Sequence, residues 1–163
     1  MTEQAAIFRG PRSDEYETPG WIFDPLHAQY RFTVDLNANA SNAKVPQHFS
    51  ADRSFLGCDG YLGCGWMNPA FSLAEPMFCK LDALASRGCK AVAIYKSSNM
   101  ETGAWSYIFA RCSWIAQPRQ RVNYLVDGVE KKGVQFASAV IGWNVDPPRV
   151  PWPHVLLEVI HGR

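Results

Sequence analysis

The chain has 163 residues, of which 47% are hydrophobic and 19% charged, and its formal net charge is +1 at pH 7. These values indicate one globular domain over residues 1–163 and argue against disorder and against a purely electrostatic nucleic-acid binder. No apolar run approaches the length of a membrane span. The polar N-terminus lacks the apolar stretch of a secretory signal, so we expect a cytoplasmic protein without membrane contact.

Cysteine usage is consistent with that location. The chain has five cysteines, an odd number, and none of them forms a C-x-x-C pair. Cys58 and Cys64 lie six residues apart, and no nearby histidine completes a zinc-binding set. We therefore expect free thiols in a reducing compartment and no metal site.

The N-terminal third predicts an arm, a helix and a short strand. Residues 1–14 read as a flexible arm. Thr18 and Pro19 suit the start of a helix, with Thr18 as N-cap and Pro19 in the first turn. Apolar residues then recur at helical spacing over residues 21–30, although Pro25 should shorten or interrupt that helix. Residues 32–35 predict a short strand that ends in a carboxylate.

The rest of the chain alternates between predicted strands and helices. Residues 36–65 are rich in Asn, Ser, Gly and Asp, and a loop of this length is usually functional or flexible. The other expected elements are a strand that ends at residue 67, a helix over 74–86 closed by Gly88, a strand over 89–95, a helix over 101–114, strands over 121–126 and 136–143, and a last strand over 155–160. Together they predict a three-layer α/β domain with a mixed sheet, in which the strands over 121–126 and 136–143 form a C-terminal antiparallel hairpin.

Three polar segments should meet at one edge of this sheet. Asp35, Asn68 and residues 95–98 each follow a predicted strand. Because α/β sheets bind ligands outside the carboxyl ends of their strands, these segments could share one cleft.

Residues 66–72 (WMNPAFS) are the most informative segment of the chain. Pro69 fixes its own φ and disfavours the helical region for Asn68, so the pair forms a stiff turn at a strand end. The amide of Asn68 and the carbonyl of Pro69 could hold an exocyclic amine, while Phe71 could stack on its base. In the alternative interpretation, this is an ordinary Asn-Pro turn and Phe71 belongs to the core.

An ordered series of such segments resembles the small phage and prophage DNA N6-adenine methyltransferases, the Dam-like family. The resemblance covers about residues 16–143, most of the chain. The segments that carry it are residues 16–21 (YETPGW), 32–38 (FTVDLNA), 42–44 (NAK), 66–72 (WMNPAFS), 97–98 (SS) with Trp105, 121–124 (RVNY) and 136–138 (FAS).

The resemblance implies a Rossmann-like methyltransferase fold, S-adenosylmethionine as cofactor and double-stranded DNA as substrate, in the host cytoplasm if the chain is phage-encoded. Asn68, Pro69 and Phe71 stand at the catalytic Asn-Pro-Pro-Tyr motif. Ala70 replaces its second proline and Phe71 its tyrosine. The expected cofactor-binding residues are Thr18, Pro19, Trp21, Asp35, Asn37 and Ala38. For Trp21 and Asp35, core packing and a turn carboxylate are the respective alternatives.

The expected chemistry requires no strong base. The lone pair of adenine N6 is delocalised into the ring, and accepting both amine hydrogens would localise it toward the methyl donor. Positioning would supply most of the acceleration, and the base must be flipped out of the duplex.

Cationic side chains that could contact DNA phosphates lie in two regions. Lys44 and Arg53 belong to the long loop, and Arg119, Arg121, Lys131 and Lys132 surround the predicted hairpin; a solvated charged face is the alternative.

Two other functions stay open. One is methylation of another planar amine, such as an RNA base or a glutamine side chain. The other is a degenerate relative that binds DNA or cofactor without catalysis, which the replacement by Ala70 motivates.

Overall fold

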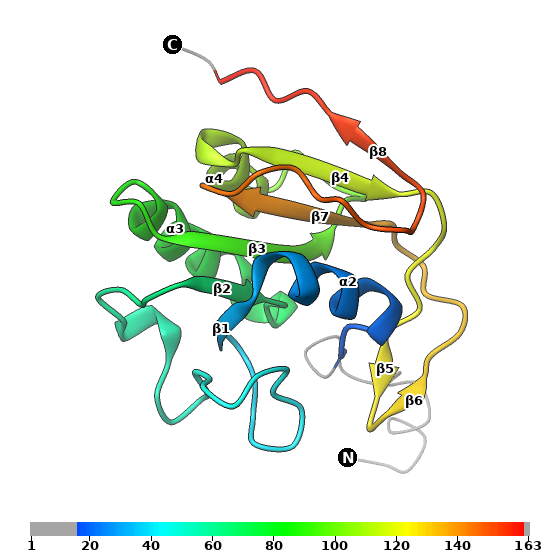
Figure 1. The fold of residues 1–163 in the computed structure, drawn as a ribbon, viewed down its shortest axis with the longest axis horizontal. Coiled ribbons are helices and arrows are strands. Elements are labelled where there is room, and N and C mark those ends of the chain that lie inside the picture. The colour runs from blue at the N-terminus through cyan, green and yellow to red at the C-terminus, as the bar shows by residue number, and fades with distance from the viewer. Residues whose placement is uncertain (1–15, 162–163) are drawn as a thin grey trace, which may run out of the picture.

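The computed structural model describes residues 16–161, so the predicted arm over residues 1–14 lies outside the described part of the chain. A six-stranded mixed sheet forms its centre, in the order β1-β2-β3-β7-β4-β8 (Figure 1). The strands of this sheet are β1 (Phe32–Asp35), β2 (Cys64–Met67), β3 (Lys90–Lys96), β7 (Ser138–Trp143), β4 (Trp114–Pro118) and β8 (His154–Leu157). β1, β2 and β3 are parallel, whereas β7 is antiparallel to both of its neighbours.

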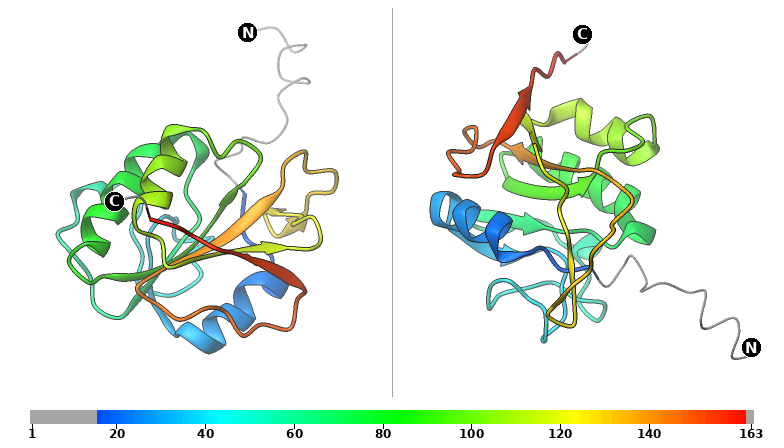
Figure 2. Two further views of the ribbon diagram at one scale, coloured as in Figure 1. Left: turned by 90° about the horizontal axis from the view of Figure 1, so that it is seen from above. Right: turned by 90° about the vertical axis from the view of Figure 1, so that its right-hand side faces the viewer.

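Helices cover both faces of the sheet, as the three-layer prediction expects (Figure 2). Alternate residues of each strand point to opposite faces. On β3, Ala93 packs in the cluster beneath α3 (Ala74–Ala85) and α4 (Gly103–Arg111), whereas Val92 packs in the cluster beneath α2 (Gly20–Tyr30). The mixed α/β architecture is consistent with a methyltransferase-like fold. Within residues 16–161, no helix combines the length and apolarity needed to cross a membrane.

The start of α2 differs from the sequence prediction. The N-cap is Pro19 rather than Thr18, because Pro19 has extended backbone angles (φ −67°, ψ 152°) and its carbonyl accepts the N–H groups of Ile22 and Phe23. The Thr18 hydroxyl therefore makes no cap and is available for another partner. Pro25 does not interrupt the helix, which continues to Tyr30 and ends where Arg31 adopts a left-handed conformation.

The predicted hairpin between residues 121–126 and 136–143 is wrong. β7 lies inside the main sheet between β3 and β4, while β5 (Leu125–Val126) pairs with β6 (Val129–Glu130) in a small ribbon of its own (Figure 1). The sequence analysis predicted no strand at the position of β4, and α4 ends at Arg111, three residues before the expected end of the helix over 101–114. The other predicted strands and helices are present within a few residues of their expected bounds.

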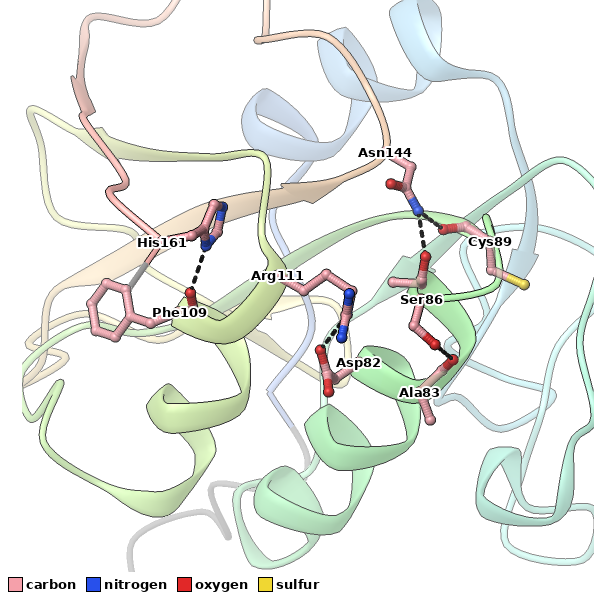
Figure 3. A network of polar contacts seen from close by, with 9 residues as sticks. Asp82, Ala83, Ser86, Cys89, Phe109, Arg111, Asn144 and His161 are labelled. Carbon is pink, nitrogen blue, oxygen red and sulfur yellow. Dashed lines mark hydrogen bonds and ion pairs between the residues drawn. The ribbon is translucent and has the colours of Figure 1, made fainter. Parts of the chain in front are cut away.

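The edge of the sheet away from the predicted cleft is tied together by side-chain hydrogen bonds (Figure 3). Asn144, which follows β7 with a positive φ of 55°, donates from Nδ2 to the carbonyls of Ala85 (2.9 Å) and Cys89 (2.8 Å). Arg111 of α4 forms an ion pair with Asp82 of α3 at 2.9 Å. One amide thus satisfies the carbonyl of the last residue of α3 and another carbonyl four residues beyond it.

We predict that Asn144→Ala lowers the free energy of unfolding by about 1–3 kcal/mol, because it removes two hydrogen bonds and because alanine tolerates a positive φ less well than asparagine does. Urea denaturation measures the effect. Asn144→Gly separates the two causes, since it loses the same hydrogen bonds while tolerating the backbone angle. An Asn144→Ala variant as stable as the wild type would contradict the assignment.

Candidate active site

A cavity of about 290 Å³ opens at the carboxyl ends of β1 and β2. Three segments line it: residues 16–18 before α2, parts of the loop that follows β1, and the turn between β2 and α3. Asp35 and Asn68 both contribute to its wall, so the prediction that these two strand ends share a cleft is confirmed. The long loop is held at this edge because Asp35 exchanges backbone hydrogen bonds with Gln47 and Phe49.

Asp35 places a buried carboxylate in the cavity wall. The residue is 2% exposed, and its two carboxylate oxygens accept the backbone N–H groups of Asn37 (3.1 Å) and Lys44 (3.0 Å). Burial raises the pKa of Asp35 to about 6, against the opposing effect of those two hydrogen bonds and of the positive charges of His48 and Lys44. Among the described residues its carboxylate has no ion-pair partner. A cationic ligand group would compensate for the solvation that the ionised carboxylate loses by burial.

Asn68 follows β2, and its side chain has a single possible orientation. Its Nδ2 donates to the backbone carbonyl of Tyr16 at 2.8 Å and to the hydroxyl of Thr18 at 3.2 Å. A backbone carbonyl can only accept, so the nitrogen must face Tyr16 and Oδ1 must face away from it. Within residues 16–161, none of the hydrogen bonds uses Oδ1. Asn68 therefore offers an oriented acceptor at the cavity.

Asn37 connects the turn that follows β1 to the turn that carries Asn68. Its Nδ2 donates to the backbone carbonyl of Asn68 at 3.1 Å, while its own N–H donates to Asp35. Asn37 lines the cavity, but its amide nitrogen is already committed to the backbone of the neighbouring turn. The side chain thus positions the turn that carries Asn68.

Pro69 and Ala70 continue the turn in an extended conformation. Pro69 is buried, and Ala70, which lines the cavity, has φ −56° and ψ 131°. These angles lie within the range that proline itself adopts. The alanine that stands at the second proline of the motif therefore preserves the backbone path, and the carbonyl of Ala70 accepts the N–H of Leu73 at 2.9 Å.

Phe71 lies beside the cavity rather than in its lining, and its ring is half-buried. Three aromatic rings stand roughly perpendicular to it, with centroid distances of 6.4 Å to Tyr16, 5.8 Å to Tyr95 and 5.2 Å to Phe136. The ammonium of Lys96 lies over the ring, 4.9 Å from its centroid. The expectation that residues 95–98 share the cleft is wrong, because none of them lines the cavity; Tyr95 and Lys96 contact Phe71 beside it instead.

The expected cofactor residues divide into two groups. Thr18, Asp35, Asn37 and Ala38 line the cavity. Pro19 and Trp21 do not: Pro19 is buried at the start of α2, and Trp21 packs edge-on against Trp152 at 6.4 Å in the cluster beneath that helix.

The expected DNA-contacting cations are also placed differently from one another. Lys44 lines the cavity, and its ammonium lies 5.5 Å from the ring centroid of Phe23, which does not line it. Arg53 lies on the loop with its guanidinium 5.4 Å from the centroid of Phe49. The other four are exposed in the segment between β4 and β7: Arg119, Arg121, Lys131 and Lys132.

Tyr16 is the site residue that the sequence reasoning left without a role. Its carbonyl orients Asn68, and its ring stacks on the buried Tyr124 at 5.4 Å. Two hydrogen bonds of 2.8 Å between Glu17 and Leu125 fix this segment against β5. Tyr16 opens the first segment of the resemblance, but only the fold shows that its backbone reaches a residue 52 positions later.

Comparison with family models points to a chemistry that suits this cavity, with its buried carboxylate and its oriented amide oxygen. Residues 8–139 match the model described as DNA N-6-adenine-methyltransferase (Dam). The chain belongs to this DNA N-6-adenine-methyltransferase family. Comparison with individual curated proteins gives no match. The matched segment includes every residue that lines the cavity and ends inside β7, and family membership implies adenine methylation of DNA.

We predict that S-adenosylmethionine binds more tightly as the pH rises from 5 to 7. The raised pKa leaves much of Asp35 protonated near pH 5, and a cationic ligand group favours the ionised form. The dissociation constant from calorimetry should fall by up to about tenfold per pH unit below the pKa and level off above pH 7. Asp35→Asn should flatten the profile, whereas His48→Gln, which removes the nearby histidine, should keep it. An Asp35→Asn variant with the wild-type pH profile would contradict this role.

We also predict that Ala70→Pro raises the free energy of unfolding by about 0.5 kcal/mol and retains methyl transfer. The φ of Ala70 already suits proline, and none of the described hydrogen bonds uses its N–H. The gain comes from restricting the unfolded chain, so Ala70→Gly should shift stability in the opposite direction. Urea denaturation tests the pair, and a destabilised proline variant would show that the turn is held differently.

Proposed function

We propose that this chain transfers the methyl group of S-adenosylmethionine to N6 of an adenine that has been flipped out of duplex DNA. The orientation of Asn68 is the observation that carries the proposal, because its amide nitrogen is committed to Tyr16, its oxygen is left as an acceptor, and the residue lines a cavity that also contains a buried carboxylate. Membership of the adenine methyltransferase family supports the same reaction.

The cavity residues fit the cofactor by charge and shape. Asp35 has no ion-pair partner among the described residues and suits the ammonium or the ribose hydroxyls of S-adenosylmethionine. Lys44 provides a cation for its carboxylate, and Leu36, Phe55 and Met77 provide apolar wall. When bound, the cofactor would supply a methyl group on a positively charged sulfur: as N6 forms its bond to the methyl carbon, the electron pair of the carbon–sulfur bond would stay on sulfur, and N6 would release one proton to solvent.

Asn68 and Pro69 would make the adenine amine a nucleophile. The Asn68 Oδ1 and the Pro69 carbonyl each accept one hydrogen of the exocyclic amine, which localises its lone pair toward the methyl group. Neither oxygen is used by the hydrogen bonds of the described residues. Tyr16 and Thr18 orient the Asn68 side chain, and Asn37 bonds to the backbone carbonyl just before Pro69, so the acceptors would need little reorganisation during the reaction.

Phe71 would stack on the extruded base. Extruding an adenine from the duplex loses base stacking, and a base-aromatic stack returns about 1–3 kcal/mol. Exposed cations on the loop and the β5–β6 segment, such as Arg53, Arg121 and Lys131, would contact phosphates. Such contacts position the duplex without reading its sequence.

Asn68→Ala should lower kcat for tritiated-methyl transfer to unmethylated DNA by about 100-fold or more, which is the usual loss when one preorganised polar group is removed. The dissociation constant for S-adenosylmethionine should change much less. Asn68→Asp should fail as well, because a carboxylate cannot donate to the Tyr16 carbonyl and the orienting bond is lost.

Asn144→Gly, at the opposite edge of the sheet, is the matched control and should methylate DNA at the wild-type rate. Transfer to RNA or protein instead of DNA would replace the proposal with another planar-amine substrate. Tight cofactor binding with no transfer to any of the three would identify a degenerate relative.

A further inference from the structure

Lys96 is a charged residue beside the candidate active site that the proposed reaction does not yet use. It ends β3, is half-buried, and places its ammonium over the face of Phe71, 4.9 Å from the ring centroid. The one ion pair among the described residues joins Arg111 and Asp82, so Lys96 has no carboxylate within 4 Å in that part of the chain. The neighbour of this ammonium is therefore an aromatic ring and not an anion.

The ammonium occupies the position where a stacked base would lie. Tyr16, Tyr95 and Phe136 contact Phe71 at interplanar angles of 83°, 89° and 70°, so none of them stacks parallel to it. Offset-stacked rings have centroids about 4.5–7 Å apart, and the 4.9 Å between the Lys96 ammonium and the centroid of Phe71 falls within that range. An adenine could not stack on this face until the lysine moved.

We propose that Lys96 covers the base-stacking face of Phe71 in the free protein and binds a DNA phosphate beside the flipped nucleotide when adenine takes its place. The proposal rests on the proposed function and adds a positioning residue to it. A flipped nucleotide carries its phosphates covalently, so an anion comes near the lysine whenever the base docks. Lysine is suited to this exchange because its ammonium sits on a flexible four-carbon stem.

In this exchange the ammonium and the ring each lose one contact and gain another. The ammonium loses its cation–π contact with the ring and gains a phosphate, which releases condensed counterions from the DNA. The ring meanwhile exchanges the cation for a base. A lysine that only covered Phe71 would gain no anion, and its removal would leave the salt dependence of DNA use unchanged.

Lys96→Met tests the proposal because it keeps an unbranched stem over the ring and removes the charge. Lys96→Arg restores the charge. Lys90→Met is the matched control, since Lys90 lies at the other end of the same strand and lines a different cavity. Methyl transfer to duplex DNA is measured for each variant at several salt concentrations, together with thermal stability and S-adenosylmethionine affinity.

Lys96→Met should raise KM for DNA with a smaller change in kcat, and the slope of log KM against log salt concentration should fall by about one. Lys96→Arg should recover most of the slope, and Lys90→Met should match the wild type. Cofactor affinity should be the same in all four proteins. A Lys96→Met variant with the wild-type salt slope, or a Lys96→Arg variant as impaired as Lys96→Met, would overturn the inference while leaving the proposed function intact. A wild-type protein that methylates no DNA would overturn both.

Discussion

The site depends on one interaction between segments far apart in the chain: the hydrogen bonds from the Asn68 amide to Tyr16 and Thr18. A free asparagine can present either its nitrogen or its oxygen to a ligand. The Tyr16 carbonyl removes that choice, and the bridge between Glu17 and Leu125 in turn holds Tyr16 against β5. The orientation of the proposed acceptor is thus set by a short segment, residues 16–18, that packs beside the sheet rather than within it.

Two charged side chains near this acceptor have no ion-pair partner among the described residues, and each matches a charge that the proposed reaction brings. Asp35 is buried in the cavity wall, where its pKa rises because ionisation there is poorly solvated. Lys96 lies over an aromatic ring. Charges without an ion-pair partner lower the stability of the free protein, but they would complement the positive charge of the cofactor and the negative charge of DNA. The cavity and the Phe71 ring adjoin through the turn at residues 68–71, so the two ligands would meet there.

The sequence was sufficient for the part of the fold in which neighbouring elements pair. β1, α3 and β3 were predicted near their observed bounds, and the Asn-Pro turn was placed at a strand end. The sequence did not predict the pairing of β7. This strand pairs with β3 and β4 rather than with the segment just before it. β4 was not predicted at all, and the helix before it was expected to end three residues later than it does. The role of the Thr18 hydroxyl could not be predicted, since its partner Asn68 lies 50 residues away and a cap is the usual local use of threonine.

The most direct measurement of the central claim is a structure of the protein bound to a non-reactive S-adenosylmethionine analogue and an adenine-containing duplex. Our account expects one adenine outside the helix, with N6 within hydrogen-bond distance of the Asn68 Oδ1 and the Pro69 carbonyl, and the analogue in the cavity beside Asp35. An analogue bound elsewhere, or an adenine whose N6 contacts neither oxygen, would contradict it.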